Sequence, residues 1–184
     1  MYTMHCCRFV VALTATAMLS FTTVASAQPA AGDREFQITG GFFLSHGDAW
    51  TGTAQGDLTY SLYASETLEY GGRQLVSYSI NDPQEDVWTG STTGFVNYYP
   101  WSANSESKWR TYVGLFAGAA YSDVDITGTA GPAIGFKYYF RDDVYFTTQY
   151  RVEVYFDNLD AGEETTDFQD ANHVLTFGVG FKFK

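Results

Sequence analysis

Charged and amide side chains recur inside segments that otherwise alternate with large apolar residues. The clearest case is 144–156 (VYFTTQYRVEVYF), in which one parity is apolar and the other holds glutamine, arginine and glutamate. Residues of one parity lie on one face of a β-strand, so these polar groups share a face. The polar residues predicted in this way to face the interior of a barrel are Glu69, Arg73, Arg110, Lys137, Gln149, Arg151 and Glu153.

Two kinds of chemistry fit such inward charges. They can line a polar path for ions, or they can form a packed and paired network that fills the interior. An eight-stranded barrel has room inside for side chains and little else. Buried charges are tolerated when they are paired and hydrogen-bonded. A packed network is therefore favoured over an ion path.

Eight segments of period-two alternation would position these side chains, and each predicts a β-strand. Outside the first 27 residues, no apolar run approaches the roughly 20 residues of a helical membrane span. Short connections mostly alternate with longer ones, which is typical of an up-and-down membrane barrel. We therefore predict an all-β fold, an eight-stranded antiparallel up-and-down transmembrane β-barrel. The predicted strands are 35–44, 57–63, 68–80, 89–99, 109–123, 129–140, 144–156 and 175–183.

Glycine indicates which face is inside. A solvated exterior gains nothing from glycine, which weakens a strand, whereas a narrow lumen needs small residues beside large charged ones. The glycines that share the parity of the basic residues are Gly114, Gly118, Gly131, Gly135, Gly178 and Gly180. The polar face is therefore predicted to point inward and the aromatic face toward lipid. The predicted inner aromatic belt is Trp109, Tyr99, Phe140, Phe181 and Phe183, and the outer belt is Tyr78, Trp88, Tyr121 and Phe156.

The first 27 residues have the features of a cleaved secretory signal peptide. Arg8 precedes an apolar run at 9–24, and small residues at 25–27 offer a cleavage site. The only two cysteines stand before the apolar run and would leave with it, so the mature chain needs no disulfide. Residues 28–184 are then one barrel domain. The net charge of −11 argues against nucleic acid as a partner.

Three motifs and the C-terminal ending carry a resemblance to a known superfamily. The motifs are 68–71 (LEYG), 113–120 (VGLFAGAA) and 135–140 (GFKYYF). With them, the chain from about residue 35 to its end resembles the outer-membrane β-barrel superfamily that includes the OmpA-type N-terminal barrel and OmpX-like proteins of Gram-negative bacteria. The resemblance implies the cell outer membrane as the location, with both termini in the periplasm and lipopolysaccharide among the surrounding lipids.

The ending is similar to the C-terminal assembly signal of that superfamily. Its elements are Thr176, Gly178, Phe181 and Phe183. Lys184 follows, whereas the family usually ends on the aromatic residue. The similarity implies that barrel-assembly machinery and periplasmic chaperones act on the chain during biogenesis.

Two acidic segments, 81–86 and 157–170, carry enough oxygen ligands to be considered for Ca²⁺ or Mg²⁺. Such ions would bridge the segments to lipopolysaccharide phosphates. The spacing of the acids matches no defined metal loop, however. We expect solvated acidic loops that face outward, with no bound metal and no cofactor.

Two histidines remain after processing, and some barrels of this size are lipid A-modifying enzymes with a serine and a histidine. A strand would place the two on one face at a spacing of two, but Ala171 and Leu175 stand two from His173. Ser45 is adjacent to His46 and would face the opposite way. A catalytic triad in a loop around His46 and Asp48 stays an open alternative. We expect both histidines to be ordinary loop residues and the chain not to be an enzyme.

These patterns together favour a non-enzymatic outer-membrane protein. Its packed polar lumen would serve as a scaffold for the acidic loops, in envelope integrity or in interaction with an unidentified surface ligand. The first alternative is a narrow, porin-like passive channel. The second is a lipid A-modifying enzyme.

Overall fold

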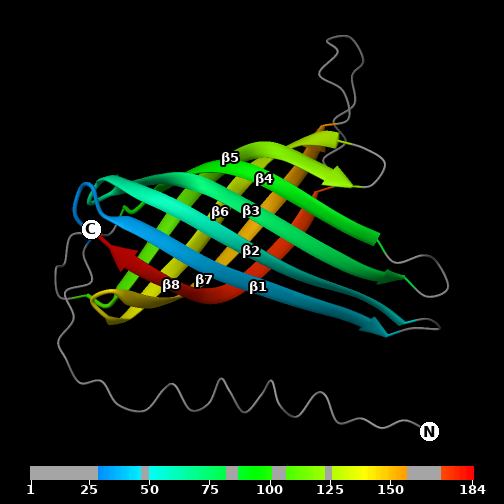
Figure 1. Ribbon diagram of the computed structural model, residues 1–184, viewed down its shortest axis with the longest axis horizontal. Coiled ribbons are helices and arrows are strands. Elements are labelled where there is room, and N and C mark those ends of the chain that lie inside the picture. Colours follow the sequence, from blue (N-terminus) through cyan, green and yellow to red (C-terminus); the bar gives the residue numbers. More distant parts are fainter. Residues whose placement is uncertain (1–28, 47–49, 82–86, 101–106, 123–125, 157–170) are drawn as a thin grey trace, which may run out of the picture.

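The computed structural model is a closed barrel of eight antiparallel strands, in which each strand pairs with the next and β8 pairs with β1 (Figure 1). The structure describes residues 29–46, 50–81, 87–100, 107–122, 126–156 and 171–184. The predicted signal peptide and most of the acidic segments lie outside these residues. The strands are β1 (Arg34–His46), β2 (Trp50–Ser65), β3 (Leu68–Asn81), β4 (Val87–Tyr98), β5 (Trp109–Ser122), β6 (Ile126–Arg141), β7 (Val144–Phe156) and β8 (Asn172–Phe183).

The predicted fold class is confirmed, and β7 has the predicted bounds. The largest difference is β2, which begins seven residues before the predicted 57–63. Its added segment pairs with β1 through Gly52, Ala54 and Gly56, whose small side chains give no apolar alternation. The described residues include no helix that is long and apolar enough to cross a membrane.

The exterior of the barrel is apolar and its interior is polar. Leu115 and Ile126 expose 68% and 74% of their surface, whereas Glu69, Lys137 and Arg151 are buried. A protein in water rarely exposes apolar patches larger than a few hundred Å². An apolar exterior around a polar lumen is the arrangement of a membrane-spanning barrel. The structure therefore has the predicted orientation.

Aromatic side chains gather outside the barrel near the two ends of the strands. At the end that holds the C-terminus, the rings of Trp109 and Tyr138 lie 4.5 Å apart, between centroids. At the opposite end, Tyr78 and Trp88 lie 4.6 Å apart. Such belts mark the membrane interfaces of transmembrane barrels.

Tyr99 was predicted to belong to the inner belt, and this prediction is wrong. Its side chain is fully buried in the lumen. Phe95 and Asn97 are buried on the same parity, whereas Val96 and Tyr98 are exposed. Large aromatic residues in this segment do not mark the lipid-facing side, because this lumen accepts rings as well as charges.

Two of the lumen glycines, Gly135 and Gly180, make room for tyrosine side chains. A Cβ atom on Gly135 would lie 2.5 Å from the Tyr112 hydroxyl and 2.7 Å from the carbonyl oxygen of Thr148. A Cβ atom on Gly180 would overlap the ring of Tyr145. These contacts explain why glycine shares the parity of the large polar residues.

Arginine on the lipid-facing exterior should destabilise the barrel most at the middle of the membrane and least near its surfaces. Leu115 is in the middle of β5, and Ile126 is the first residue of β6. We expect Leu115→Arg to lower the free energy of unfolding in lipid vesicles by about 2–4 kcal/mol, and Ile126→Arg by about 0–1 kcal/mol. Denaturant titration measures both. Equal effects would contradict the membrane-spanning orientation.

Alanine at a lumen glycine should be costly, whereas alanine at an outward glycine should not. For Gly135→Ala we expect a loss of about 1–3 kcal/mol, because Tyr112 and the Thr148 carbonyl leave no space for a methyl group. The matched control is Gly56→Ala, where the nearest atom to the new Cβ is 3.9 Å away. Unfolding in denaturant compares the two, and a neutral Gly135→Ala would show that the lumen is not tightly packed there.

Candidate functional site

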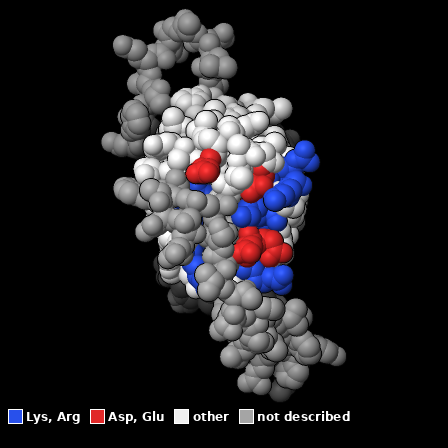
Figure 2. Space-filling model, turned by 90° about the vertical axis from the view of Figure 1, so that its left-hand side faces the viewer, with Lys and Arg blue, Asp and Glu red and all other residues white. Residues whose placement is uncertain are grey.

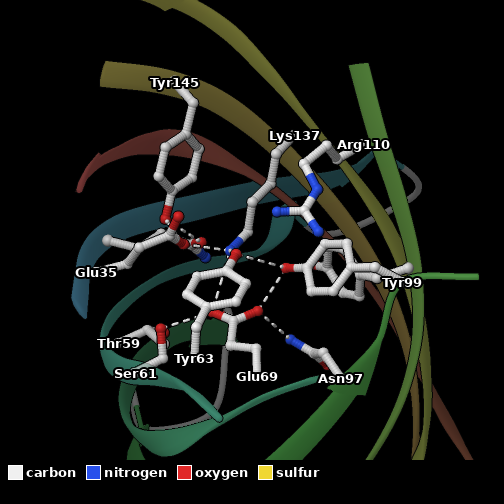
Figure 3. A network of polar contacts seen from close by, with 12 residues as sticks. Glu35, Thr59, Ser61, Tyr63, Glu69, Asn97, Tyr99, Arg110, Lys137 and Tyr145 are labelled. Carbon is white, nitrogen blue, oxygen red and sulfur yellow. Dashed lines mark hydrogen bonds and ion pairs between the residues drawn. The ribbon is translucent and has the colours of Figure 1, made fainter. Parts of the chain in front are cut away.

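Lys137, on β6, is the centre of a network in the half of the lumen nearer the C-terminus (Figure 3). Its ammonium group forms ion pairs with Glu35 on β1 and, at 3.0 Å, with Glu69 on β3. It also donates a hydrogen bond of 3.1 Å to the Tyr63 hydroxyl. The ammonium group therefore has three oxygen partners from three other strands, which matches its three donors.

Tyrosine hydroxyls satisfy Glu35. Tyr139 donates to one carboxylate oxygen and Tyr145 to the other, both at 2.8 Å. The Tyr145 hydroxyl also lies 3.4 Å from the side-chain oxygen of Gln37. The carboxylate is therefore held by charge-assisted hydrogen bonds as well as by Lys137.

Glu69 is satisfied by different donors. Ser61 donates to one of its carboxylate oxygens at 2.6 Å. Asn97 and Tyr99 donate to the other at 3.1 and 2.5 Å. Figure 3 shows these side chains converging on the carboxylate from β2, from β4 and from just beyond β4.

Arg110 closes the network at the inner end. Its guanidinium carbon lies 4.3 Å from the centre of the Tyr99 ring and 5.6 Å from that of Tyr63. One of its terminal nitrogens donates to the backbone oxygen of Glu66 at 2.5 Å. The other two nitrogens have no hydrogen-bond partner among the described residues. Stacking on rings is a usual environment for guanidinium groups.

A second network lies nearer the other end and is built around Asp57 on β2. Arg151, on β7, approaches one oxygen of Asp57 at 3.2 Å, and Arg73, on β3, approaches the other at 3.9 Å. The hydroxyl of Thr39 also donates to Asp57. The guanidinium of Arg73 lies over the ring of Phe95, 5.3 Å from its centre.

Gln149 joins the two networks. Its side-chain oxygen accepts from Arg73 at 2.7 Å and from Arg151 at 3.3 Å, and its nitrogen donates to the Tyr112 hydroxyl at 3.0 Å. The Tyr112 ring lies 5.3 Å from that of Tyr99 in the first network. Polar and aromatic contacts therefore continue across the middle of the lumen.

Glu153 is the outermost acid of the second network. One carboxylate oxygen lies 3.3 Å from Arg151 Nε, at ion-pair distance but without hydrogen-bond geometry. The other accepts from the Tyr155 hydroxyl at 3.0 Å. Its side chain is 13% exposed, more than those of Asp57 and Arg151 at 1% each. Glu153 therefore lies at the boundary between the packed lumen and the open outer mouth.

Each network is balanced in formal charge. The first contains two carboxylates, one lysine and one arginine, and the second contains two carboxylates and two arginines. The contacts join strands that are far apart in sequence, such as Lys137 with Glu35. Such an arrangement fills and braces a lumen. Among the described residues, no group of three His, Cys, Asp or Glu is placed to hold a metal ion.

The structure places all seven sequence-predicted polar residues in the lumen, in two groups. Glu69, Arg110 and Lys137 belong to the first network, and the other four belong to the second. Sequence reasoning missed Glu35 and Asp57, although each shares the polar parity of its strand. The same alternation would have found them. It did not single out the buried lumen tyrosines, because tyrosine occurs on both faces of these strands and its polarity does not distinguish them; they are Tyr63, Tyr99, Tyr112, Tyr139 and Tyr145.

The predicted assembly signal lies along β8. Thr176 is buried and its hydroxyl lies 3.5 Å from the backbone oxygen of Gln149. Phe181 and Phe183 face outward, with 45% and 42% of their surface exposed. Gly178 packs against the backbone of β1 at Thr39. Recognition of this segment by an assembly machine stays a prediction.

His173 is not a loop residue, contrary to the prediction. It is the second residue of β8 and faces outward, with its Nδ1 atom 2.5 Å from the Tyr150 hydroxyl. The alternation of β8 extends further toward the acidic segment than the apolar residues suggested. His46 is the last residue of β1, and its side chain and Asp48 lie outside the described part of the chain.

Removing Lys137 should be strongly destabilising. Lys137→Met would leave Glu35 and Glu69 buried without their ion-pair partner, and we expect a loss of about 3–5 kcal/mol in unfolding free energy. Adding Glu35→Gln and Glu69→Gln to that variant should recover most of the loss. The control is Arg141→Gln, which removes an exposed ion pair with Asp143 and should cost about 0–1 kcal/mol. A neutral Lys137→Met would refute the network's structural role.

Solved structures of outer-membrane proteins are similar to the whole barrel. The outer membrane protein OprG from Pseudomonas aeruginosa matches with a TM-score of 0.52 and 12% identity, over 85% of this chain and 98% of that one. Neisserial surface protein A (NspA) matches with a TM-score of 0.54 and 14% identity, over 85% and 99%. No protein-family model and no curated protein sequence matches the chain. The chain therefore has the fold of the eight-stranded outer-membrane β-barrels.

Proposed function

We propose that the chain is a non-enzymatic outer-membrane protein of a Gram-negative bacterium, whose closed lumen is a rigid scaffold for its acidic outer segments. It would serve envelope integrity or interaction with a surface ligand. The observation that carries the proposal is the pair of charge-balanced networks across the lumen. Lys137, Glu35 and Glu69 take part in eight ionic and hydrogen-bonding contacts, so their charges serve the packing of the lumen.

The proposed orientation puts the short connections and both ends of the described chain in the periplasm. Residues 66–67 and 142–143 form tight turns at the end that holds the C-terminus. Figure 2 looks onto this end and shows Lys and Arg beside Asp and Glu. The segments that join strands at the other end hold many Asp and Glu and no Lys or Arg. Short turns on the periplasmic side are typical of outer-membrane barrels.

The proposed partners follow from the exterior. Outer-membrane lipids, with lipopolysaccharide on the outer side, would cover the apolar surface between the aromatic belts. The outward Phe181 and Phe183 would be available to barrel-assembly machinery and periplasmic chaperones before insertion. Neither proposal needs a metal or a cofactor.

A narrow passive channel is the second candidate, because the outer half of the lumen is not filled. A cavity of about 420 Å³ lies there, above Glu153. For a channel, ions would have to pass from this cavity through the contacts of Arg73, Gln149 and Arg151. Because those contacts obstruct the path of an ion, the scaffold is the better-supported function.

Conductance in planar bilayers tests the scaffold against the channel. We expect no stable openings from the native chain, because the two networks block the lumen. Arg151→Ala should raise the conductance by removing part of the block, whereas Arg141→Gln, outside the lumen, should not. Reproducible native openings that Arg151→Ala or Glu153→Gln abolish would contradict the scaffold and support the channel.

A further inference from the structure

The outer half of the lumen holds a cavity that the scaffold does not use. Its volume is about 420 Å³, within the range of small-molecule pockets. Seven of its sixteen lining residues are Ser or Thr, and they come from β2, β3, β4, β5 and β6. We call this cavity the outer vestibule. Hydroxyl groups on several walls can accept hydrogen bonds from different parts of one ligand.

The floor of the vestibule combines one carboxylate with apolar side chains. Glu153 is the only charged lining residue, and Leu75 and Val174 are the buried apolar ones. Gln55 also lines the vestibule, and its side-chain nitrogen is buried without a hydrogen-bond partner among the described residues. The floor therefore presents carboxylate and amide oxygens as hydrogen-bond acceptors, the amide nitrogen of Gln55 as a donor, and methyl groups of Leu75 and Val174 beside them.

Charge along the chain favours a cationic ligand. The sequence segments 47–49, 82–86, 123–125 and 157–171 connect the strand ends at this mouth. They contain twelve of the 21 Asp and Glu residues and no Lys or Arg. A mouth of one charge sign raises the local concentration of the opposite ion and speeds its arrival. Anions are disfavoured on the same ground.

The lining does not suit a metal ion. Ca²⁺ sites use six to eight oxygen ligands with several carboxylates, and Mg²⁺ sites demand near-ideal octahedral geometry. Here a single carboxylate faces the vestibule, which is fewer than either metal ion requires. Ammonium groups, by contrast, bind well to hydroxyl oxygens, and methylene groups between them would pack on Leu75 and Val174.

We propose that the outer vestibule is a binding site for a linear polyamine, with ammonium groups donating to the hydroxyl lining and to Glu153. This site goes beyond the scaffold function, and its binding of a ligand does not depend on that function, because the vestibule lies outside the blocked part of the lumen. In the orientation proposed above, a ligand would approach it from outside the cell.

Calorimetric titration of the full barrel in phosphatidylcholine vesicles with spermidine tests the proposal. We expect saturable binding to one site per chain, weakened by rising salt as attraction between charges requires. Glu153→Gln should weaken it at least tenfold. Ser91→Leu, which fills the vestibule without touching the charged network, should do the same. Glu66→Gln, at an exposed acid of the opposite end, is the matched control and should bind as the native chain does.

Folding of each variant is checked by its heat-modifiable migration on gels, and Ser91→Leu keeps the test valid if Glu153→Gln does not fold. Spermidine binding that neither vestibule variant weakens would place the ligand on the outer segments and overturn the proposal. So would the absence of saturable binding, or equal affinity for glucose. Displacement of spermidine by Mg²⁺ beyond the effect of matched ionic strength would overturn it too, in favour of a metal site.

Discussion

Lys137 and Arg151 illustrate the constraint on which this structure depends. Eight strands close a lumen that side chains fill at the level of the two networks, so a charge that faces inward there needs its counter-charge inside. Lys137 reaches between Glu35 and Glu69, and Arg151 reaches across to Asp57. Because these partners come from strands on different sides of the barrel, the pairs that neutralise charge also brace its cross-section.

Tyrosine suits this lumen for two reasons. Its ring fills volume in a way that serine or threonine does not, and its hydroxyl gives a buried carboxylate a donor that phenylalanine lacks. Tyr139 and Tyr145 do both for Glu35. The bulk has to be accommodated, and glycine on a neighbouring strand accommodates it, as Gly180 does for Tyr145. Glycine and tyrosine are therefore complementary parts of one packing scheme.

Alternation predicts which face a residue is on, and little beyond that. It placed Arg151 and Lys137 in the lumen, and the eight strands follow from it almost completely. It failed at Tyr99, because the polarity of tyrosine does not reveal a face when rings occur on both. It also gave no pairing across the lumen: Lys137 and Glu35 are 102 residues apart, and only the closure and stagger of the barrel bring them together.

The inner half of the lumen is more tightly packed than the outer half, so ligand binding is expected in the outer half. The inner half is filled by rings and by the ion pairs of Lys137 with Glu35 and Glu69, whose polar atoms are hydrogen-bonded, so a solute entering there would have to break several contacts at once. The outer half is lined by short hydroxyl side chains, which leave a cavity above Glu153. Among the described residues, the basic side chains other than Arg73 and Arg151 lie toward the inner end, and the segments that connect the strands at the other end are rich in Asp and Glu. A barrel that only needed to be stable could fill both halves alike. Because the outer half is hollow and the segments that connect its strands are acidic in sequence, we expect the chain to recognise ligands at its outer mouth.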